Sequence, residues 1–332
     1  MIISRTPFRI SFFGVGTDYP VWYKENGGAV LVTTINKYCY ISCRYLPPFF
    51  EHKSRIVYSF VENVKNISEI RHPAVKHCLS FMKIKKGMEI HHDGDLPARS
   101  GIGSSSSFTV GLLHALYALK GKMPTKRQLA FDAIHLEQEL MRENVGSQDQ
   151  VSVAFGGFNL IEFGGQEHIK VRPITMNQKR LELFQDHLMF FFTGLSRTAS
   201  DIAGELIKMT SSNKKELSQM HNMVNAALDI LNSNCDISEF GRLLHKNWQV
   251  KRSLSSRIST SYIDEVYSAA LKAGALGGKL VGAGGGGFML IFAKPQIQPK
   301  IRERLKKLLY VPFRFENLGS QIIFYNQQTE PA

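Results

Sequence analysis

The sequence has 332 residues, of which 43% are hydrophobic and 21% charged, and it carries a formal net charge of +13. A chain of this length usually folds as more than one domain, and its hydrophobic content excludes an intrinsically disordered protein. The basic excess suits nucleic acid, an anionic membrane surface or small phosphorylated ligands, and charge alone does not choose among these partners.

Two further global features narrow the class of protein. The cysteines lack the spacing of a zinc site and predict reduced thiols rather than a disulfide framework: Cys39, Cys43, Cys78 and Cys235. Arg5 and Arg9 interrupt the first segment before a secretory apolar stretch develops, and no run approaches the roughly 18 apolar residues of a membrane span. No long basic tract or aromatic-basic RNA signature occurs. We expect a cytoplasmic protein that binds neither nucleic acid nor membrane.

The first 95 or so residues carry short β-branched and aromatic runs separated by glycine turns. These patterns predict one helix, Pro73–Met82, and strands at Val30–Ile35, Tyr38–Cys43, Arg55–Phe60 and Met88–His92.

A glycine- and serine-rich loop, Leu96–Ser107, follows and leads into a predicted buried helix, Phe108–Lys120. Thr125 and Gln128 form a capping-box pattern that predicts the start of a further helix, which should end near Glu143.

The second half begins after a hairpin-like stretch, Val151–Phe163, and a polar segment. We predict domains at 1–170 and 171–332. The second is expected to be α+β, with strands at Leu188–Phe192, Phe288–Ala293 and Gln321–Tyr325.

The loop Ser100–Ser107 has the features of a phosphate cradle. Its glycines allow close approach of the backbone, and the helix that follows directs free amide groups toward an anion. A flexible linker is the alternative, although linkers seldom adjoin an apolar helix directly. The lysine of the Walker pattern is absent, so an ordinary P-loop protein is disfavoured.

Three segments in a fixed order make the assignment to a protein family more specific. They are Pro7–Pro20 (PFRISFFGVGTDYP), the serine loop followed along the chain by Glu137 and Asp149, and Gly282–Phe288 (GAGGGGF). Together they resemble the three motifs of the GHMP kinases, over nearly the whole chain. The resemblance implies an α+β protein of two domains, an N-terminal α/β domain with a left-handed crossover and a ferredoxin-like C-terminal domain, with ATP and Mg²⁺ bound between them.

The resemblance also assigns roles to residues. It implies phosphate binding by Gly101, Gly103, Ser104, Ser105 and Ser106, Mg²⁺ ligation by Ser105 and Glu137, and a glycine loop near the phosphates at Gly282, Gly284, Gly285 and Gly286. A hydroxyl, a carboxylate and nucleotide phosphates suit a hard cation. An exposed helix carboxylate is the ordinary alternative for Glu137.

Asp149 matches the carboxylate that orients or deprotonates the attacking hydroxyl, and Arg9 matches the arginine that supports it. A turn aspartate and a structural ion pair are the alternatives. Thr17 and Asp18 match positions that hold substrate hydroxyls, with a local turn before Pro20 as the competing explanation.

Within the family, the sequence resembles most the kinases that phosphorylate D-glycero-D-manno-heptose 7-phosphate at its anomeric hydroxyl. The match rests on RTPFRISFFGVGTDYP, on TGLSRTAS at 193–200 and on NWQVKRSL at 247–254. Galactokinases carry a Glu-His pair where this chain has Val15 and Gly16, which disfavours galactose. A GHMP kinase for another sugar, such as fucose or galactose, is the alternative. A basic nucleic-acid-binding protein is the alternative from a different class, but it would leave the serine loop, Glu137 and Asp149 unexplained.

A substrate that already bears a phosphate needs a cationic clamp away from the reacting hydroxyl. The candidates from the matching stretches are Arg197, Lys251, Arg252 and Lys279, each of which could equally be a surface cation. Monomer and homodimer remain open.

Overall fold

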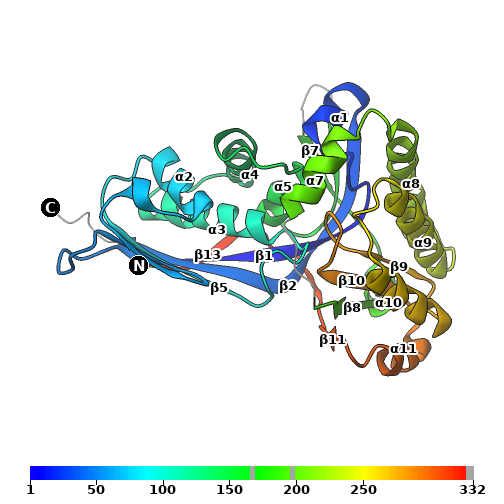
Figure 1. Ribbon diagram of the computed structural model, residues 1–332. Helices are drawn as coiled ribbons and strands as arrows, with labels where there is room; N and C mark the ends of the chain where they lie inside the picture. The colour runs from blue at the N-terminus through cyan, green and yellow to red at the C-terminus, as the bar shows by residue number, and fades with distance from the viewer. Residues whose placement is uncertain (165–168, 195–198, 327–332) are drawn as a thin grey trace.

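The computed structural model describes residues 1–164, 169–194 and 199–326. Figure 1 shows two sheets, each covered by helices, arranged side by side along the length of the molecule. Within the described residues, no helix is long and apolar enough to cross a membrane.

The larger sheet has nine strands, and its central strands run in the order β13-β1-β2-β5-β3-β4. Its strands are β1 (Ile2–Phe13), β2 (Gly28–Tyr45), β3 (Ser54–Val57), β4 (Val61–Val64), β5 (Met88–Gly94), β6 (Phe158–Phe163), β7 (Ile169–Pro173), β12 (Phe315–Glu316) and β13 (Gln321–Tyr325). The long β1 and β2 pair antiparallel, from Ile2 opposite Cys43 to Phe13 opposite Leu31. The first half of β2 is buried throughout, whereas its second half alternates between buried and partly exposed residues, as expected where one face meets solvent.

Helices of the first half pack on one face of this sheet (Figure 1). They are α1 (Pro20–Asn26), α2 (Pro73–Phe81), α3 (Ser104–Leu119), α4 (Lys126–His135) and α5 (Gln148–Phe155), with a 3₁₀ turn at Ile67–Glu69. A π-helical turn, η2 (Leu136–Leu140), continues α4. Thr125 caps α4 by accepting a hydrogen bond from the Gln128 amide at 3.1 Å, as the sequence predicted.

The second sheet is four-stranded and antiparallel in the order β11-β8-β10-β9. Its strands are β8 (Leu188–Phe192), β9 (Gly277–Leu280), β10 (Phe288–Phe292) and β11 (Leu309–Tyr310). The accompanying helices are α6 (Gln178–Asp186), α7 (Ala199–Lys208), α8 (Lys214–Asn232), α9 (Ser238–Ser253), α10 (Ser261–Lys272) and α11 (Gln298–Arg304), with a 3₁₀ turn at Pro295–Ile297. This strand order, with helices after the first and third strands, is the ferredoxin-like arrangement that was expected.

Buried phenylalanines join the two halves. The ring of Phe12 on β1 lies 5.5 Å from that of Phe184 on α6 and 5.6 Å from that of Phe240 on α9. Phe184 and Phe240 meet edge to face at 4.6 Å. Edge-to-face pairs of this kind stabilise beyond their buried area, so the cluster fixes one sheet against the other.

Three sequence predictions were wrong in detail. Val151–Phe155 is the end of helix α5 rather than a strand, because its alternating valines are buried against α3 and α4 instead of following a pleat. Helix α3 begins at Ser104 rather than at Phe108, so the serines form its first turn. Strands β12 and β13, assigned by sequence to the second domain, pair with β2 and β1 of the first sheet.

Candidate active site

A cavity of about 1090 Å³ lies between the two halves. Most of its wall comes from β1, the serine loop, the N-terminal end of α5 and the segment between α4 and α5. The second half contributes Ala203 on α7 and the Gly282–Ala283 backbone. The cavity therefore gathers the three sequence segments that motivated the family resemblance.

The serine loop lines the cavity through Gly101, Gly103 and the first turn of α3. Gly101 and Gly103 have φ of +81° and +75°, a conformation that glycine adopts freely. The first amides of α3 have no acceptor within the helix, so they can bind an anion in the cavity. Ser104, Ser105 and Ser106 also line it, and Ser105 is exposed there.

Two glycine loops nearly 180 residues apart meet at this wall. A Cβ on Gly101 would lie 2.4 Å from the Val281 carbonyl oxygen, and a Cβ on Gly282 would lie 2.5 Å from the Gly101 Cα. A Cβ on Gly287 would lie 2.1 Å from the Ser100 carbonyl oxygen. Backbone thus packs directly on backbone, which leaves no room for any side chain. Gly282 reaches the cavity, whereas the next three glycines lie behind it, with Gly285 hydrogen-bonded to the Ile258 carbonyl at 2.9 Å.

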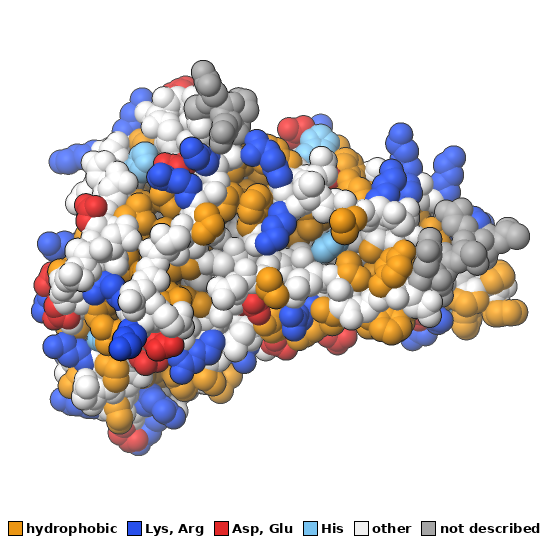
Figure 2. Space-filling view, turned by 180° about the vertical axis from the view of Figure 1, so that it is seen from behind, with side chains coloured by type: hydrophobic (Ala, Val, Ile, Leu, Met, Phe, Trp, Pro, Cys, Tyr) orange, Lys and Arg blue, Asp and Glu red, His pale blue; other side chains and the backbone are white. Residues whose placement is uncertain are grey.

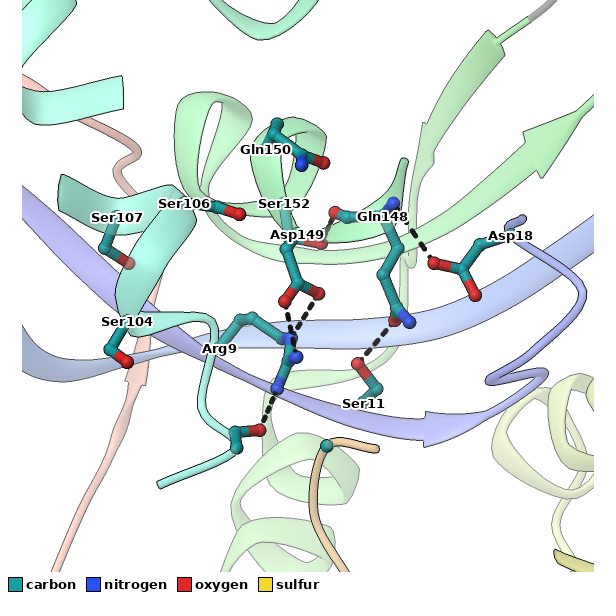
Figure 3. Close-up of polar contacts among 12 residues, drawn as sticks. Arg9, Ser11, Asp18, Ser104, Ser106, Ser107, Gln148, Asp149, Gln150 and Ser152 are labelled. Carbon is teal, nitrogen blue, oxygen red and sulfur yellow. Dashed lines mark hydrogen bonds and ion pairs between the residues drawn. The ribbon is translucent and has the colours of Figure 1, made fainter. Parts of the chain in front are cut away.

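Arg9 and Asp149 form a bidentate ion pair at the wall of the cavity (Figure 3). Arg9 Nε and Nη2 each donate to a carboxylate oxygen of Asp149 at 2.7 Å, and Nη1 donates to the Gly101 carbonyl at 2.6 Å. The Arg9 side chain is 5% exposed and that of Asp149 is 24% exposed. The arginine therefore locks the carboxylate in place while one side of Asp149 faces the cavity.

Asp18 lies beside this pair, and both residues line the cavity. Its carboxylate accepts hydrogen bonds from the Gly16 amide at 3.0 Å and from the Gln148 amide at 3.4 Å. Burial, and secondarily the charge of Asp149, raise the pKa of Asp18 to about 6. Gln148 in turn accepts a hydrogen bond from Ser11 at 2.6 Å, which ties β1 to the first turn of α5.

Glu137 is fully buried on the π-helical turn, which excludes the exposed carboxylate considered from sequence. One carboxylate oxygen, Oε2, accepts hydrogen bonds from Ser106 at 2.9 Å and from Gln150. Burial raises the pKa of Glu137 to about 7. The hydroxyl that meets Glu137 is thus that of Ser106, not Ser105, because adjacent residues on a helix point in different directions.

The surroundings of Glu137 suit a hard cation or a bound water. Gln150 Oε1 is buried without a hydrogen-bond partner among the described residues, and the Thr109 hydroxyl lies close enough to the Glu137 carboxylate to oppose the rise in its pKa. Buried oxygens are rarely left unpaired, and an all-oxygen donor set is the one that Mg²⁺ prefers. No group of three or more His, Cys, Asp or Glu side chains occurs in the described parts of the chain, so phosphate oxygens would have to complete the coordination of a cation here.

The far end of the cavity is aromatic. His72 stacks on Phe108 with ring centroids 4.5 Å apart, and Tyr58 meets His72 edge to face at 4.8 Å. Glu62 holds this end in place by accepting hydrogen bonds from the Tyr58 hydroxyl and from the amides of Arg71 and His72. Burial and the neighbouring His92 lower the pKa of His72 to about 4, so its ring is neutral.

Several predicted site residues do not reach the cavity. Thr17 is buried, and its hydroxyl lies 2.8 Å from the Gly14 carbonyl within the turn. Lys279 donates to the carbonyls of Ser11 and Phe12 at 2.9 and 3.1 Å, and Lys251 donates to that of Gly282. Arg252 pairs with Asp264 at 2.8 Å.

The prediction that Lys251, Arg252 and Lys279 clamp a substrate phosphate is therefore wrong, because their charged groups bind other partners. Arg197 lies outside the described residues. Burial lowers the pKa of Lys251 to about 7 and holds that of Lys279 well below its usual value, since neither ammonium group meets a carboxylate in the described structure.

Other residues of the cavity wall were not predicted from the sequence. Gln148 is one of them, and its position next to Asp149 at the start of α5 was the available signal. The aromatic end draws on three separate segments, and only folding brings Tyr58, His72 and Phe108 together.

The GHMP kinase N-terminal domain model matches residues 66–157, and the GHMP kinase C-terminal model matches residues 230–311. A D-glycero-α-D-manno-heptose 7-phosphate kinase of Campylobacter jejuni is 27% identical over 322 residues, which cover 92% of this chain and 93% of the relative.

Solved structures agree in fold. A D-glycero-D-manno-heptose 1-phosphate kinase from Bacteroides thetaiotaomicron superposes with a TM-score of 0.73 at 22% identity, covering 98% of this chain and all of that one. Lactococcus lactis galactokinase superposes with a TM-score of 0.72 at 18% identity, covering 96% and 94%. The paired domain models, the full-length relative and the shared fold place this chain in the GHMP kinase family of phosphotransferases, which use ATP as phosphate donor.

Proposed function

We propose that this kinase transfers the γ-phosphoryl group of ATP to the anomeric hydroxyl of D-glycero-D-manno-heptose 7-phosphate, giving the 1,7-bisphosphate. The observation that carries the chemistry is the Arg9–Asp149 pair beside the serine loop. The full-length similarity to a heptose 7-phosphate kinase supports the substrate.

The cavity divides naturally between the two substrates. The aromatic end would take the nucleobase against His72 and Phe108, and the first turn of α3 would take the phosphates. The sugar would then lie at the opposite end, with its reacting hydroxyl near Asp149 and other hydroxyls near Asp18. A carboxylate oxygen has two lone pairs, so Asp149 can accept the proton of the attacking hydroxyl while Arg9 holds it.

Mg²⁺ would be held by Glu137 with Ser106 or Ser105, and would neutralise charge on the transferring phosphate. The residues themselves supply alignment: Arg9 fixes both Asp149 and the Gly101 carbonyl, so base and phosphate loop keep one geometry. Phosphoryl transfer depends mostly on such positioning. Arg197 remains the candidate for the sugar phosphate from sequence.

The test offers Mg-ATP with heptose 7-phosphate, unphosphorylated heptose, fucose and galactose, following ADP release and locating the new phosphate by ³¹P NMR. We expect turnover on heptose 7-phosphate and a new signal of an anomeric phosphate. Turnover of fucose or galactose, with none on heptose 7-phosphate, would contradict the substrate assignment but leave a GHMP sugar kinase.

A further inference from the structure

Arg99 has a backbone conformation that the fold around it does not explain. Among the described non-glycine residues, Lys83, Arg99 and Arg142 have a left-handed φ, which is +58° for Arg99. Lys83 and Arg142 each come directly after the C-cap residue of a helix, where a left-handed φ is a common helix ending. Arg99 lies in the loop before α3, where Gly101 and Gly103 already supply the sharp turns. A side chain kept in such a conformation next to a site points to a role in that site.

The backbone of Arg99 is held in place, whereas its side chain is free. Its amide donates to Ser104 Oγ at 3.1 Å, which fixes the turn against the first residue of α3. The side chain is exposed and lines the cavity, and it makes no ion pair or hydrogen bond with any described residue. A long cation is therefore presented to the cavity without a partner of its own.

The position of Arg99 lies between the two regions assigned to the nucleotide. On one side is Ser104, at the start of the phosphate-binding helix. On the other is His72, whose pKa is lowered by burial and by His92, with a smaller contribution from the charge of Arg99. Along the cavity wall, this is the junction between the aromatic end and the serine loop.

We propose that Arg99 is a nucleotide-binding residue that clamps the phosphates next to the ribose. The proposal rests on the proposed function and specifies it further, because the serine loop alone would bind phosphates through neutral amides. A guanidinium fork matches two phosphate oxygens at once and gains strength where water is partly excluded. Arg71 also lines the cavity, but its amide is bound by Glu62 at the aromatic end, and no hydrogen bond or ion pair joins Arg71 to the first turn of α3 in the described structure.

The test compares Arg99→Gly, Arg99→Lys and wild type, with Lys83→Gly as the matched control. Glycine suits φ of +58°, so Arg99→Gly should melt no lower than wild type. Isothermal titration with Mg-ADP should show a loss of about tenfold or more in affinity for Arg99→Gly, with adenosine affinity unchanged. Arg99→Lys keeps the charge but not the fork and should fall between the two. Lys83→Gly should alter neither affinity.

Two results would overturn the proposal: equal Mg-ADP affinity for wild type and Arg99→Gly, or an equal loss for adenosine and ADP, which would indicate contact with the base. A failure of the proposed function gives a different result, because it would appear as turnover of another sugar in the substrate assay, with Mg-ADP affinity still dependent on Arg99.

Discussion

Replacing Asp149 with asparagine tests the centre of the proposed site with the smallest change of shape. The asparagine carbonyl can still accept one hydrogen bond from Arg9, but its amide nitrogen then faces the second guanidinium donor. The variant thus removes the candidate base and leaves part of a buried cation without its acceptor. ATP should still bind, because the serine loop and aromatic end are untouched.

The expected magnitudes differ for stability and for catalysis. A hydrogen bond to a charged group contributes about 1.5–3 kcal/mol, and the 24% exposure of the Asp149 side chain lets water replace part of it. We expect the free energy of unfolding to fall by about 2 kcal/mol. Loss of a positioned general base typically lowers kcat by about 10²–10⁴-fold.

The matched control is Asp132→Asn, outside the cavity wall. Its buried carboxylate also accepts two side-chain hydrogen bonds, from Tyr117 at 2.6 Å and from Gln128 at 2.7 Å. Both variants should melt lower, but only Asp149→Asn should lose turnover in an ADP-release assay, with Mg-ADP affinity by calorimetry near wild type in each. A kcat for Asp149→Asn within about tenfold of wild type would refute the role of Asp149 as base.

Three further variants test other parts of the site. Burial raises the pKa of Glu137 from 4.5 to about 7, so between pH 4.5 and about 7 the folded state keeps a proton that the unfolded state releases. The free energy of unfolding should therefore fall by up to about 3 kcal/mol as the pH rises through this range. Glu137→Gln should flatten this part of the melting profile and weaken Mn²⁺ binding with ADP by EPR; an unchanged profile would contradict the shift. Burial lowers the pKa of Lys251 from 10.5 to about 7, so the unfolded state binds more protons there and stability should rise with pH across that window. Lys251→Met should make the rise smaller, with buried Lys279 supplying the remainder, and exposed Lys272→Met should leave it unchanged, as melting temperatures would show. Gly101→Ala would place a Cβ at a φ of +81° and 2.4 Å from the Val281 carbonyl oxygen. The free energy of unfolding in urea should fall by about 3 kcal/mol, and KM for ATP should rise. Wild-type values for both would show that the two glycine loops can separate.

The sequence was most informative where the chemistry of a segment is local. The serine loop, the Arg9–Asp149 pair and Asp18 were predicted from motifs whose residue types must be present whatever the fold. The helix cap at Thr125 likewise depends only on residues three apart. Several β-strands were also visible as apolar runs, among them β2, β5, β8, β10 and β13, whereas the helix 148–155 was hidden by valines that favour strands.

What could not be predicted depends on contacts distant in the chain. Lys251 and Lys279 have the composition of a phosphate clamp, but packing directs their amines to backbone carbonyls. Ser105 and Ser106 are equivalent in sequence, and only the direction of each side chain on α3 decides which meets Glu137. The nucleobase end likewise needs three separate segments to converge.

The pairing of β13 with β1 gives the molecule an unusual chain order. Because β12 and β13 belong to the first sheet, the ferredoxin-like unit is in effect an insertion between β7 and β12 of the first domain. Ile2 pairs with Tyr325, so the edge of β1 stays unpaired until residues 321–325 have been synthesised. A fragment ending at residue 170 would expose that edge to pairing with other chains, whereas the inserted unit can complete its own sheet earlier. During synthesis, the domain that begins first is therefore the one that finishes last.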